Sequence, residues 1–231
     1  MNQLEFLSKT VTSAKKGIVL IHGFGANAED LYPLSDYFRL SDPVNWFFPQ
    51  APILLGGMYG TDARAWFPLG VGDRIRDAVH TDDWSEILDY TPDGLLDARK
   101  VLNDFLDSLD IPYEDIVLGG FSQGAMLALD IFLSRKDKPL GLVLYSGTIL
   151  HENYWKEAAL EKSGYRFYQS HGTMDPLLPF RAAERLNGFL NESGMMGDLE
   201  VFTGGHEIPM SVLKSSNLYL DSCLKENSES A

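Results

Sequence analysis

The sequence predicts an α/β fold with a mostly parallel central sheet, helices on both of its faces and no separate cap domain. Short apolar, β-branched segments alternate along the chain with longer segments of good helix formers, and this order favours a parallel sheet covered by helices. The strand segments are apolar throughout, as strands buried on both faces should be. Polar, glycine-rich turns follow several of them, and in a parallel sheet such turns share one edge.

In the first part of the chain, a buried strand over 18–21 leads into a glycine-rich turn and then into a helix over about 28–39. The next strand covers 46–48 and is stopped by Pro49. Residues 53–90 are expected to form a long irregular loop, because glycines recur along them. Loops of this length inside a compact protein are usually functional or partly disordered.

The next helix begins at Thr91-Pro92-Asp93, which supplies a cap, a first-turn proline and a first-turn acid. Its apolar stripe ends before Pro112. Further strands are expected over 115–119, 140–145, 165–170 and 199–203, and further helices over 125–133, 154–162, 180–191 and 209–224. The whole chain, 1–231, is expected to form one domain with a frayed polar tail over 225–231.

Composition fits one enzyme domain of 231 residues, of which 45% are hydrophobic. The net charge of −14 argues against nucleic acid as a partner and against unaided adsorption to anionic membranes. Much of this charge lies in 73–115, where thirteen acidic residues stand against four basic ones, for a net charge of −9. The chain contains no apolar run of about 18 or more residues, the length that marks a candidate membrane-spanning helix, and the N-terminus lacks a signal-peptide pattern. A single cysteine, Cys223, fits a reducing compartment, so a cytoplasmic protein is expected.

The motif Gly-Phe-Ser-Gln-Gly at 120–124 lies between a strand and a helix of this pattern. In that position the serine occupies a tight, strained turn that pushes its hydroxyl clear of the sheet. Glycine on both sides lets strand and helix approach each other closely. Ser122 is therefore the expected nucleophile, and the backbone N–H of Gln123 is the expected donor to an oxyanion.

A serine nucleophile needs a base and an acid that orients the base, and in this architecture the acid precedes the histidine in the chain. Asp175 follows the strand expected over 165–170, and His206 follows the one over 199–203. Because the turns after parallel strands meet at one edge, Ser122, Asp175 and His206 are expected to converge there.

The turn after the first strand, His-Gly-Phe-Gly at 22–25, is the candidate for the second oxyanion donor, the backbone N–H of Phe24. A nucleotide-binding turn is the alternative, because that pattern tolerates the alanine found here at position 28. Among the other histidines, His80 and His151 are expected at the surface and His171 in a packed structural position.

The long loop is expected to line the substrate pocket through Met58, Trp66 and Trp84, with core packing as the alternative for its aromatic residues. A shallow trough of this kind favours short to medium acyl chains. The acid-rich flank is expected to disfavour anionic head groups.

The chain resembles the α/β-hydrolase group of carboxylesterases, lysophospholipases and acyl-protein thioesterases from about 16 to 224. The resemblance is carried by the motifs around His22, Ser122 and Asp175, by Phe-Pro-Gln-Ala-Pro at 48–52 and by Ala-Trp-Phe at 65–67. It implies an α/β-hydrolase fold and a Ser–Asp–His enzyme for acyl esters or thioesters, without metal or organic cofactor. Two departures concern the acyl pocket: Ala26-Asn27 and Pro68 each replace a position where the family often has aspartate.

The expected function is therefore hydrolysis of carboxylic esters of short to medium chain, with a small-molecule or lipid ester as substrate. A long-chain lysophospholipase or acyl-protein thioesterase is the first alternative, and a non-catalytic binding protein of the same fold is the second. A peptidase on this fold stays open, whereas dienelactone hydrolases use a cysteine where this chain has Ser122. A homodimer is left open.

Overall fold

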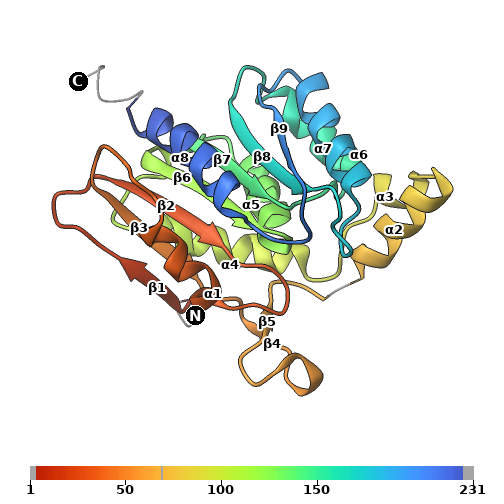
Figure 1. Cartoon of the computed structure of the whole chain (residues 1–231), viewed down its shortest axis with the longest axis horizontal. Coiled ribbons are helices and arrows are strands. Elements are labelled where there is room, and N and C mark those ends of the chain that lie inside the picture. The colour runs from red at the N-terminus through yellow and green to blue at the C-terminus, as the bar shows by residue number, and fades with distance from the viewer. Residues whose placement is uncertain (1–3, 69, 226–231) are drawn as a thin grey trace.

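A seven-stranded sheet forms the centre of the protein (Figure 1), in the order β1-β3-β2-β6-β7-β8-β9. The computed structural model describes residues 4–68 and 70–225, without the side chains of Met58 and Val71. Its strands are β1 (Phe6–Lys9), β2 (Lys16–Ile21), β3 (Val44–Pro49), β6 (Ile116–Phe121), β7 (Gly141–Tyr145), β8 (Phe167–Gly172) and β9 (Leu199–Phe202). All neighbouring strands are parallel except β1, which runs antiparallel to β3.

The strand order reverses between β2 and β6. From β2 the chain moves outward to β3 on one side, and it later returns with β6 on the other side. The turns that leave the carboxyl ends of these two strands therefore diverge and open a crevice, which is where open α/β sheets bind their ligands.

Two apolar clusters cover the two faces of the sheet. Along β2, Val19 and Ile21 belong to one cluster, while Ile18 and Leu20 belong to the other, as the alternation of side chains along a strand requires. The first cluster includes residues of α4 (Leu95–Asp107), α5 (Gln123–Ser134), α6 (Glu152–Leu160) and α7 (Phe180–Glu192). The second includes residues of α1 (Ala28–Leu31) and α8 (Met210–Lys225). The α/β fold predicted from the alternation of segments is confirmed.

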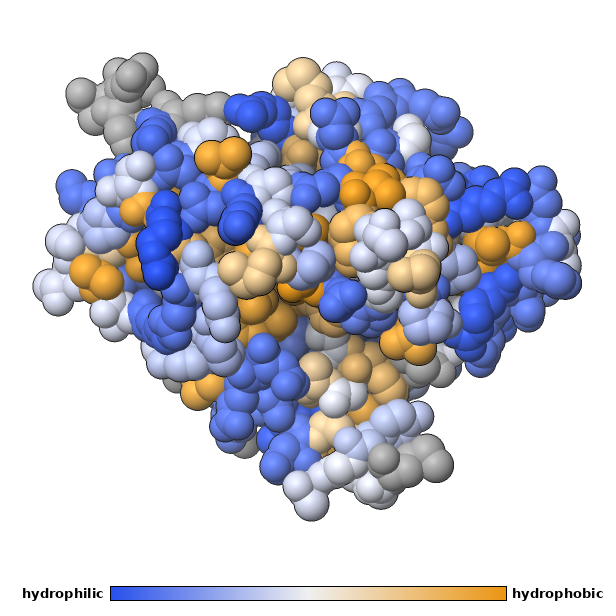
Figure 2. Space-filling view, in the orientation of Figure 1, coloured by the Kyte–Doolittle hydropathy of each residue, from blue (hydrophilic) through white to orange (hydrophobic). Residues whose placement is uncertain are grey.

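The expectation of an irregular loop over 53–90 is wrong. The segment contains a hairpin of β4 (Ile53–Leu54) and β5 (Arg64–Ala65), a 3-10 turn η2 (Gly57–Tyr59), and the helices α2 (Val71–Thr81) and α3 (Ser85–Leu88). Ile75 and Ala78, three residues apart in α2, and Ile87 of α3 pack into the main core cluster. That burial stabilises both helices, including α2 with its glycines at 70 and 72. Figure 2 shows a largely hydrophilic surface over α2 and α3.

Other element limits differ in smaller ways. The helix expected over 28–39 tightens at Pro33 into the 3-10 turn η1 (Tyr32–Asp36), and a short turn η3 (Tyr113–Asp115) precedes β6. Strand β1 was not expected. The tail was expected to fray from 225, but Lys225 is the last residue of α8, and 226–231 lie outside the described residues. Among the described helices, none is long and apolar enough to cross a membrane.

Candidate active site

Ser122 lies in a strained turn between β6 and α5, with φ 55° and ψ −120°. Its backbone N–H donates to the carbonyl oxygen of Tyr145 at 2.9 Å, which ties the turn to β7. A Cβ at Gly120 would collide with the backbone of Gly124, and a Cβ at Gly124 would collide with the carbonyl oxygen of Ile21. Both glycines are therefore required for the close approach that holds Ser122 in this conformation.

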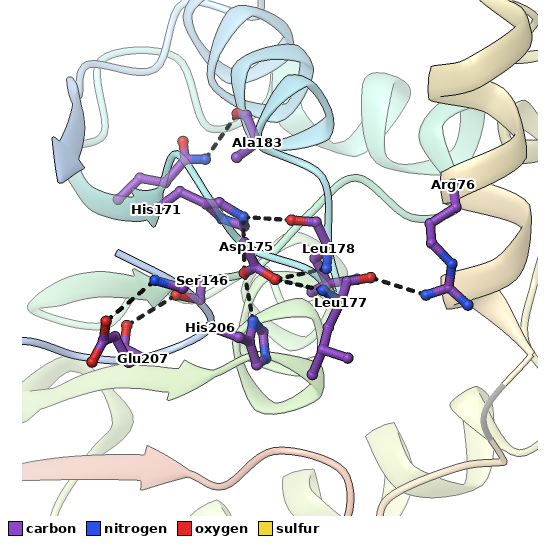
Figure 3. Close-up of polar contacts among 11 residues, drawn as sticks. Arg76, Ser146, His171, Asp175, Leu177, Leu178, Ala183, His206 and Glu207 are labelled. Carbon is purple, nitrogen blue, oxygen red and sulfur yellow. Dashed lines mark hydrogen bonds and ion pairs between the residues drawn. The ribbon is translucent and has the colours of Figure 1, made fainter. Parts of the chain in front are cut away.

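Asp175 follows β8 and has a fully buried carboxylate. Its Oδ1 accepts the N–H groups of Leu177 at 2.8 Å and Leu178 at 2.9 Å, and its Oδ2 lies 2.6 Å from Nδ1 of His206 (Figure 3). Burial alone would raise the pKa of Asp175, but hydrogen bonds from His171, His206 and Leu178 outweigh it and hold the pKa well below its usual range. The carboxylate is therefore charged at neutral pH.

His206 lies in the turn after β9, and its ring packs against Phe121 with the centroids 4.8 Å apart. Because ionised Asp175 can only accept, Nδ1 of His206 carries the proton of their hydrogen bond, which leaves Nε2 to act as a base. The backbone N–H of Thr173 donates to the carbonyl oxygen of Phe202, and that of Met174 donates to the carbonyl oxygen of Gly204, both at 2.9 Å. These hydrogen bonds join the turns that carry Asp175 and His206. The acid and the histidine are thus held on one connected unit.

His171 touches the same carboxylate from the opposite side. Its Nε2 lies 2.8 Å from the carbonyl oxygen of Leu178 and 3.2 Å from Oδ2 of Asp175, and its side chain is fully buried (Figure 3). Both neighbours are acceptors, so Nε2 carries the proton. The sequence predicted a packed structural histidine here but not its contact with Asp175; the spacing of four residues across the end of a strand is the signal that could have indicated it.

The turn after β2 is held by its histidine. Nδ1 of His22 donates to the carbonyl oxygen of Gly23 at 2.8 Å, and Nε2 accepts the backbone N–H of Ala51 at 3.1 Å. Burial lowers the pKa of His22 to about 4, so the ring is neutral at physiological pH. This neutral ring fixes the backbone that leads to Phe24, one of the two expected oxyanion donors.

The side chain of Gln123, the other expected donor, connects α5 to the segment after β5. Its Oε1 accepts the backbone N–H of Trp66 at 2.9 Å, and its Nε2 donates to the carbonyl oxygen of Phe67 at 2.9 Å. The indole Nε1–H of Trp66 donates to the carbonyl oxygen of His22 at 2.9 Å. Both expected oxyanion turns are therefore braced by the same segment.

The expected pocket residues need correction. Trp66 is only 1% exposed and does not line the cavity beside Ser122, because its indole braces the turn at His22. Trp84 also lies in the core, where the guanidinium of Arg185 is 4.6 Å from its ring centroid. The side chain of Met58, the third expected residue, lies outside what the structure describes.

A cavity of about 330 Å³ contains Ser122 and His206 in its wall. Its other described side chains are apolar or aromatic, apart from one arginine of α2 and the amide of Gln123. They are Phe24, Ala26, Tyr59, Arg76, Phe121, Gln123, Met126, Leu177 and Leu178. A serine hydroxyl and an imidazole oriented by a carboxylate, beside an apolar cavity, suit the transfer of an acyl group.

Over residues 4–68 and 70–225, no three His, Cys, Asp or Glu side chains are grouped so that they could hold a metal ion. His80 is exposed on α2, as expected. His151 is only partly exposed, and its Nδ1 lies 2.5 Å from the hydroxyl of Thr91.

Known proteins resemble this chain over most of its length. The sequence profile of the phospholipase/carboxylesterase family matches residues 2–224. Acyl-protein thioesterase 1 of Saccharomyces cerevisiae is 29% identical over 203 residues, which cover 84% of each chain. Carboxylesterase SOBER1 of Arabidopsis thaliana is 27% identical over 222 residues, covering 92% of this chain and 90% of that one. The crystal structure of esterase PE8 superposes with a TM-score of 0.78 at 27% identity, covering 96% and 99%.

Proposed function

From the premise that this chain belongs to the phospholipase/carboxylesterase family, we propose that it cleaves carboxylic esters of short to medium acyl chain through Ser122, His206 and Asp175. The family and the relatives make the chain an ester- or thioester-cleaving hydrolase of the α/β-hydrolase fold. The observation that carries the proposal is the hydrogen bond of 2.6 Å between Asp175 and His206, beside a cavity that also contains the strained Ser122.

In the first step, Nε2 of His206 takes the proton of the Ser122 hydroxyl as its oxygen attacks the ester carbonyl carbon. Asp175 holds the imidazole in the required tautomer and stabilises the cation that forms. The backbone N–H groups of Phe24 and Gln123 donate to the oxyanion. The carbon–oxygen bond to the alcohol then breaks, and His206 returns the proton to the leaving alcohol.

In the second step, His206 activates a water molecule, which attacks the acyl–Ser122 ester and releases the acid. Each lost oxyanion donor typically costs about 3 kcal/mol of transition-state stabilisation.

The preference for short to medium chains rests on the size of the cavity. At about 330 Å³ it is at the small end of ligand pockets, and the buried side chain of Met126 forms part of its wall. Each methylene that enters should add up to about 0.8 kcal/mol of binding, and nothing once the chain leaves the cavity.

The long-chain alternative, a lysophospholipase or acyl-protein thioesterase, is favoured by a different observation. Tyr59 and Leu177 line the cavity and are also 52% and 53% exposed, so they could continue an apolar path for a longer chain beyond it. Several relatives are named as acyl-protein thioesterases.

Measuring kcat/KM on 4-nitrophenyl esters from acetate to palmitate, beside matched acyl thioesters, distinguishes these functions. We expect a maximum at short to medium chains that moves to shorter chains in Met126→Trp, because the larger side chain fills the cavity. A steady rise to palmitate, unchanged in that variant, would support the long-chain enzyme instead.

The nucleophile is tested by Ser122→Ala, which should lose labelling by a fluorophosphonate and lower kcat by about 10⁴-fold or more. Ser134→Ala is the matched control, because its hydroxyl donates to Ile131 at the opposite end of the same helix. Wild-type turnover in Ser122→Ala would overturn the mechanism, and an unlabelled wild-type protein would support a non-catalytic binding function. The cytoplasmic location and a homodimer stay predictions.

A further inference from the structure

One cation reaches the cavity beside Ser122. Arg76, in α2, lines this cavity. Among its lining side chains in the described part of the chain, Arg76 is the only one with a fixed charge, and no carboxylate is present. The apolar walls formed by Met126, Leu177 and their neighbours lie around it. A positive charge in such a wall is a feature that hydrolysis of a simple alkyl ester does not need.

The guanidinium of Arg76 is positioned by two contacts but keeps further hydrogen-bond donors. Its Nη1 donates to the carbonyl oxygen of Leu177 at 3.2 Å (Figure 3), and its Nη2 pairs with the carboxylate of Asp73 one turn earlier in the helix. Asp73 is 82% exposed and Arg76 45%, so water screens this pair strongly and it adds little stability. A guanidinium has five N–H donors, and these two bonds leave further donors for a ligand.

The neighbouring arginine of the same helix is placed differently. Nη1 of Arg74 lies 2.9 Å from the carboxylate of Glu86, and its guanidinium lies 4.5 Å from the ring centroid of Tyr90. It does not line the cavity. The position of Arg76 is therefore not a general consequence of basic residues on α2, and Arg74 serves as a matched control.

We propose that Arg76 forms a subsite for an anionic group of the substrate, so that this enzyme prefers esters carrying a carboxylate or phosphate at the end of a short apolar spacer. A planar guanidinium binds either oxyanion with two parallel hydrogen bonds, and the apolar walls accommodate the spacer. This inference rests on the proposed function. It also reverses the expectation that acidic residues of 73–115 disfavour anionic substrates. Exposed charges beyond about 10 Å are screened by salt, and Asp73, which pairs with Arg76, is itself screened by water because it is 82% exposed, whereas Arg76 lies in the cavity wall.

The test compares the 4-nitrophenyl half-ester of adipic acid with its neutral methyl ester, using nitrophenol release as the readout. Adipate is chosen because the free carboxylate of succinate or glutarate half-esters attacks its own ester. We expect Arg76→Ala to reduce kcat/KM on the charged ester at least about tenfold more than on the neutral one. Arg76→Lys should retain part of the preference, because it keeps the charge but not the planar fork. Arg74→Ala should leave the preference unchanged.

The dependence of this preference on ionic strength is an independent measurement. The wild-type preference should shrink as ionic strength rises, and that of Arg76→Ala should not. A second pair, butyryl glycerol phosphate and butyryl glycerol, shows whether a phosphate on the alcohol side is accepted in place of a carboxylate on the acyl side. A preference for the charged ester that depends on Arg76, in either pair, supports the subsite. The pair that shows it identifies which anionic group the subsite binds.

Two outcomes would overturn the proposal. An equal loss on charged and neutral esters in Arg76→Ala would make the side chain only a brace between α2 and Leu177, and an unchanged preference would leave it without a role in binding. Thermal unfolding of each variant separates these results from loss of fold. Failure of the proposed mechanism is seen separately, because Ser122→Ala would then remain active on both esters.

Discussion

A side chain at position 124 would meet the carbonyl oxygen of Ile21 inside van der Waals contact. We therefore expect Gly124→Ala to push β2 and α5 apart, to lower the free energy of unfolding by several kcal/mol and to abolish esterase activity. Gly188→Ala is the control, because it lies in α7 with no heavy atom within 4 Å of the added Cβ. It should be neutral or stabilise by up to about 1 kcal/mol. Denaturant unfolding of both variants decides the comparison, and similar effects at the two sites would contradict it.

His22 gives the stability of the protein a pH dependence with a definite sign. Its pKa falls from 6.5 to about 4 on folding, so between these values the unfolded chain binds the proton and the folded chain does not. The free energy of unfolding therefore decreases as pH falls through this window, by an amount on the order of 3 kcal/mol for this residue. In His22→Asn the decrease should be smaller by about that amount. His80→Asn, at an exposed position of α2, should retain the wild-type slope; a wild-type slope in His22→Asn would refute the assignment.

Residue types at strand ends were enough to predict which polar groups meet. Asp175 and His206 were predicted to converge because each follows a strand, and the structure places them 2.6 Å apart. The contacts of Arg76 with Leu177 and of His171 with Asp175 were not predicted. The first contact depends on how α2 packs against the turn after β8, which no local pattern specifies, whereas the spacing of four residues could have indicated the second.

At the scale of elements, the segment 53–90 shows why recurring glycines are a weak signal for irregular structure. The glycines occur at the ends of the short elements, where Gly56 and Gly60 flank η2 and Gly70 precedes α2. Helix α2 is then stabilised by burial of Ile75 and Ala78. The apolar spacing inside α2 was the stronger observation, because burying an apolar face contributes more than local propensity.

The same segment also supports the expected oxyanion turn through the bond from Trp66 to His22, and Trp66→Phe tests this role. The change removes the indole N–H and leaves the buried carbonyl of His22 unpaired, which should cost about 1–3 kcal/mol. We expect a lower kcat on every ester and an unchanged dependence on chain length, because Trp66 does not line the cavity. Trp84→Phe, which keeps an aromatic face for Arg185, is the control. A loss of activity in Trp66→Phe that is confined to longer esters would show instead that Trp66 lines the acyl pocket.

For the whole molecule, the alternation of segments predicted the parallel sheet and the edge at which its polar turns meet. It did not predict the size or the charge of the cavity. Those properties depend on Tyr59, Arg76 and Leu177, which come from three separate parts of the chain. The antiparallel strand β1 was also missed, because it pairs only with β3 at the edge of the sheet and has a half-exposed pattern that resembles a loop.

The position of β9 has a consequence for how the enzyme loses activity. His206 follows β9, which is the last strand of the sheet and pairs only with β8, whereas Ser122 follows β6 near the centre. Edge strands open locally at a lower free energy than central ones. We expect amide hydrogen exchange in β9 to be faster than in β2 and β6, and mild heating to inactivate the enzyme before far-UV circular dichroism changes. Coincident loss of activity and ellipticity would show instead that the sheet opens as one cooperative unit.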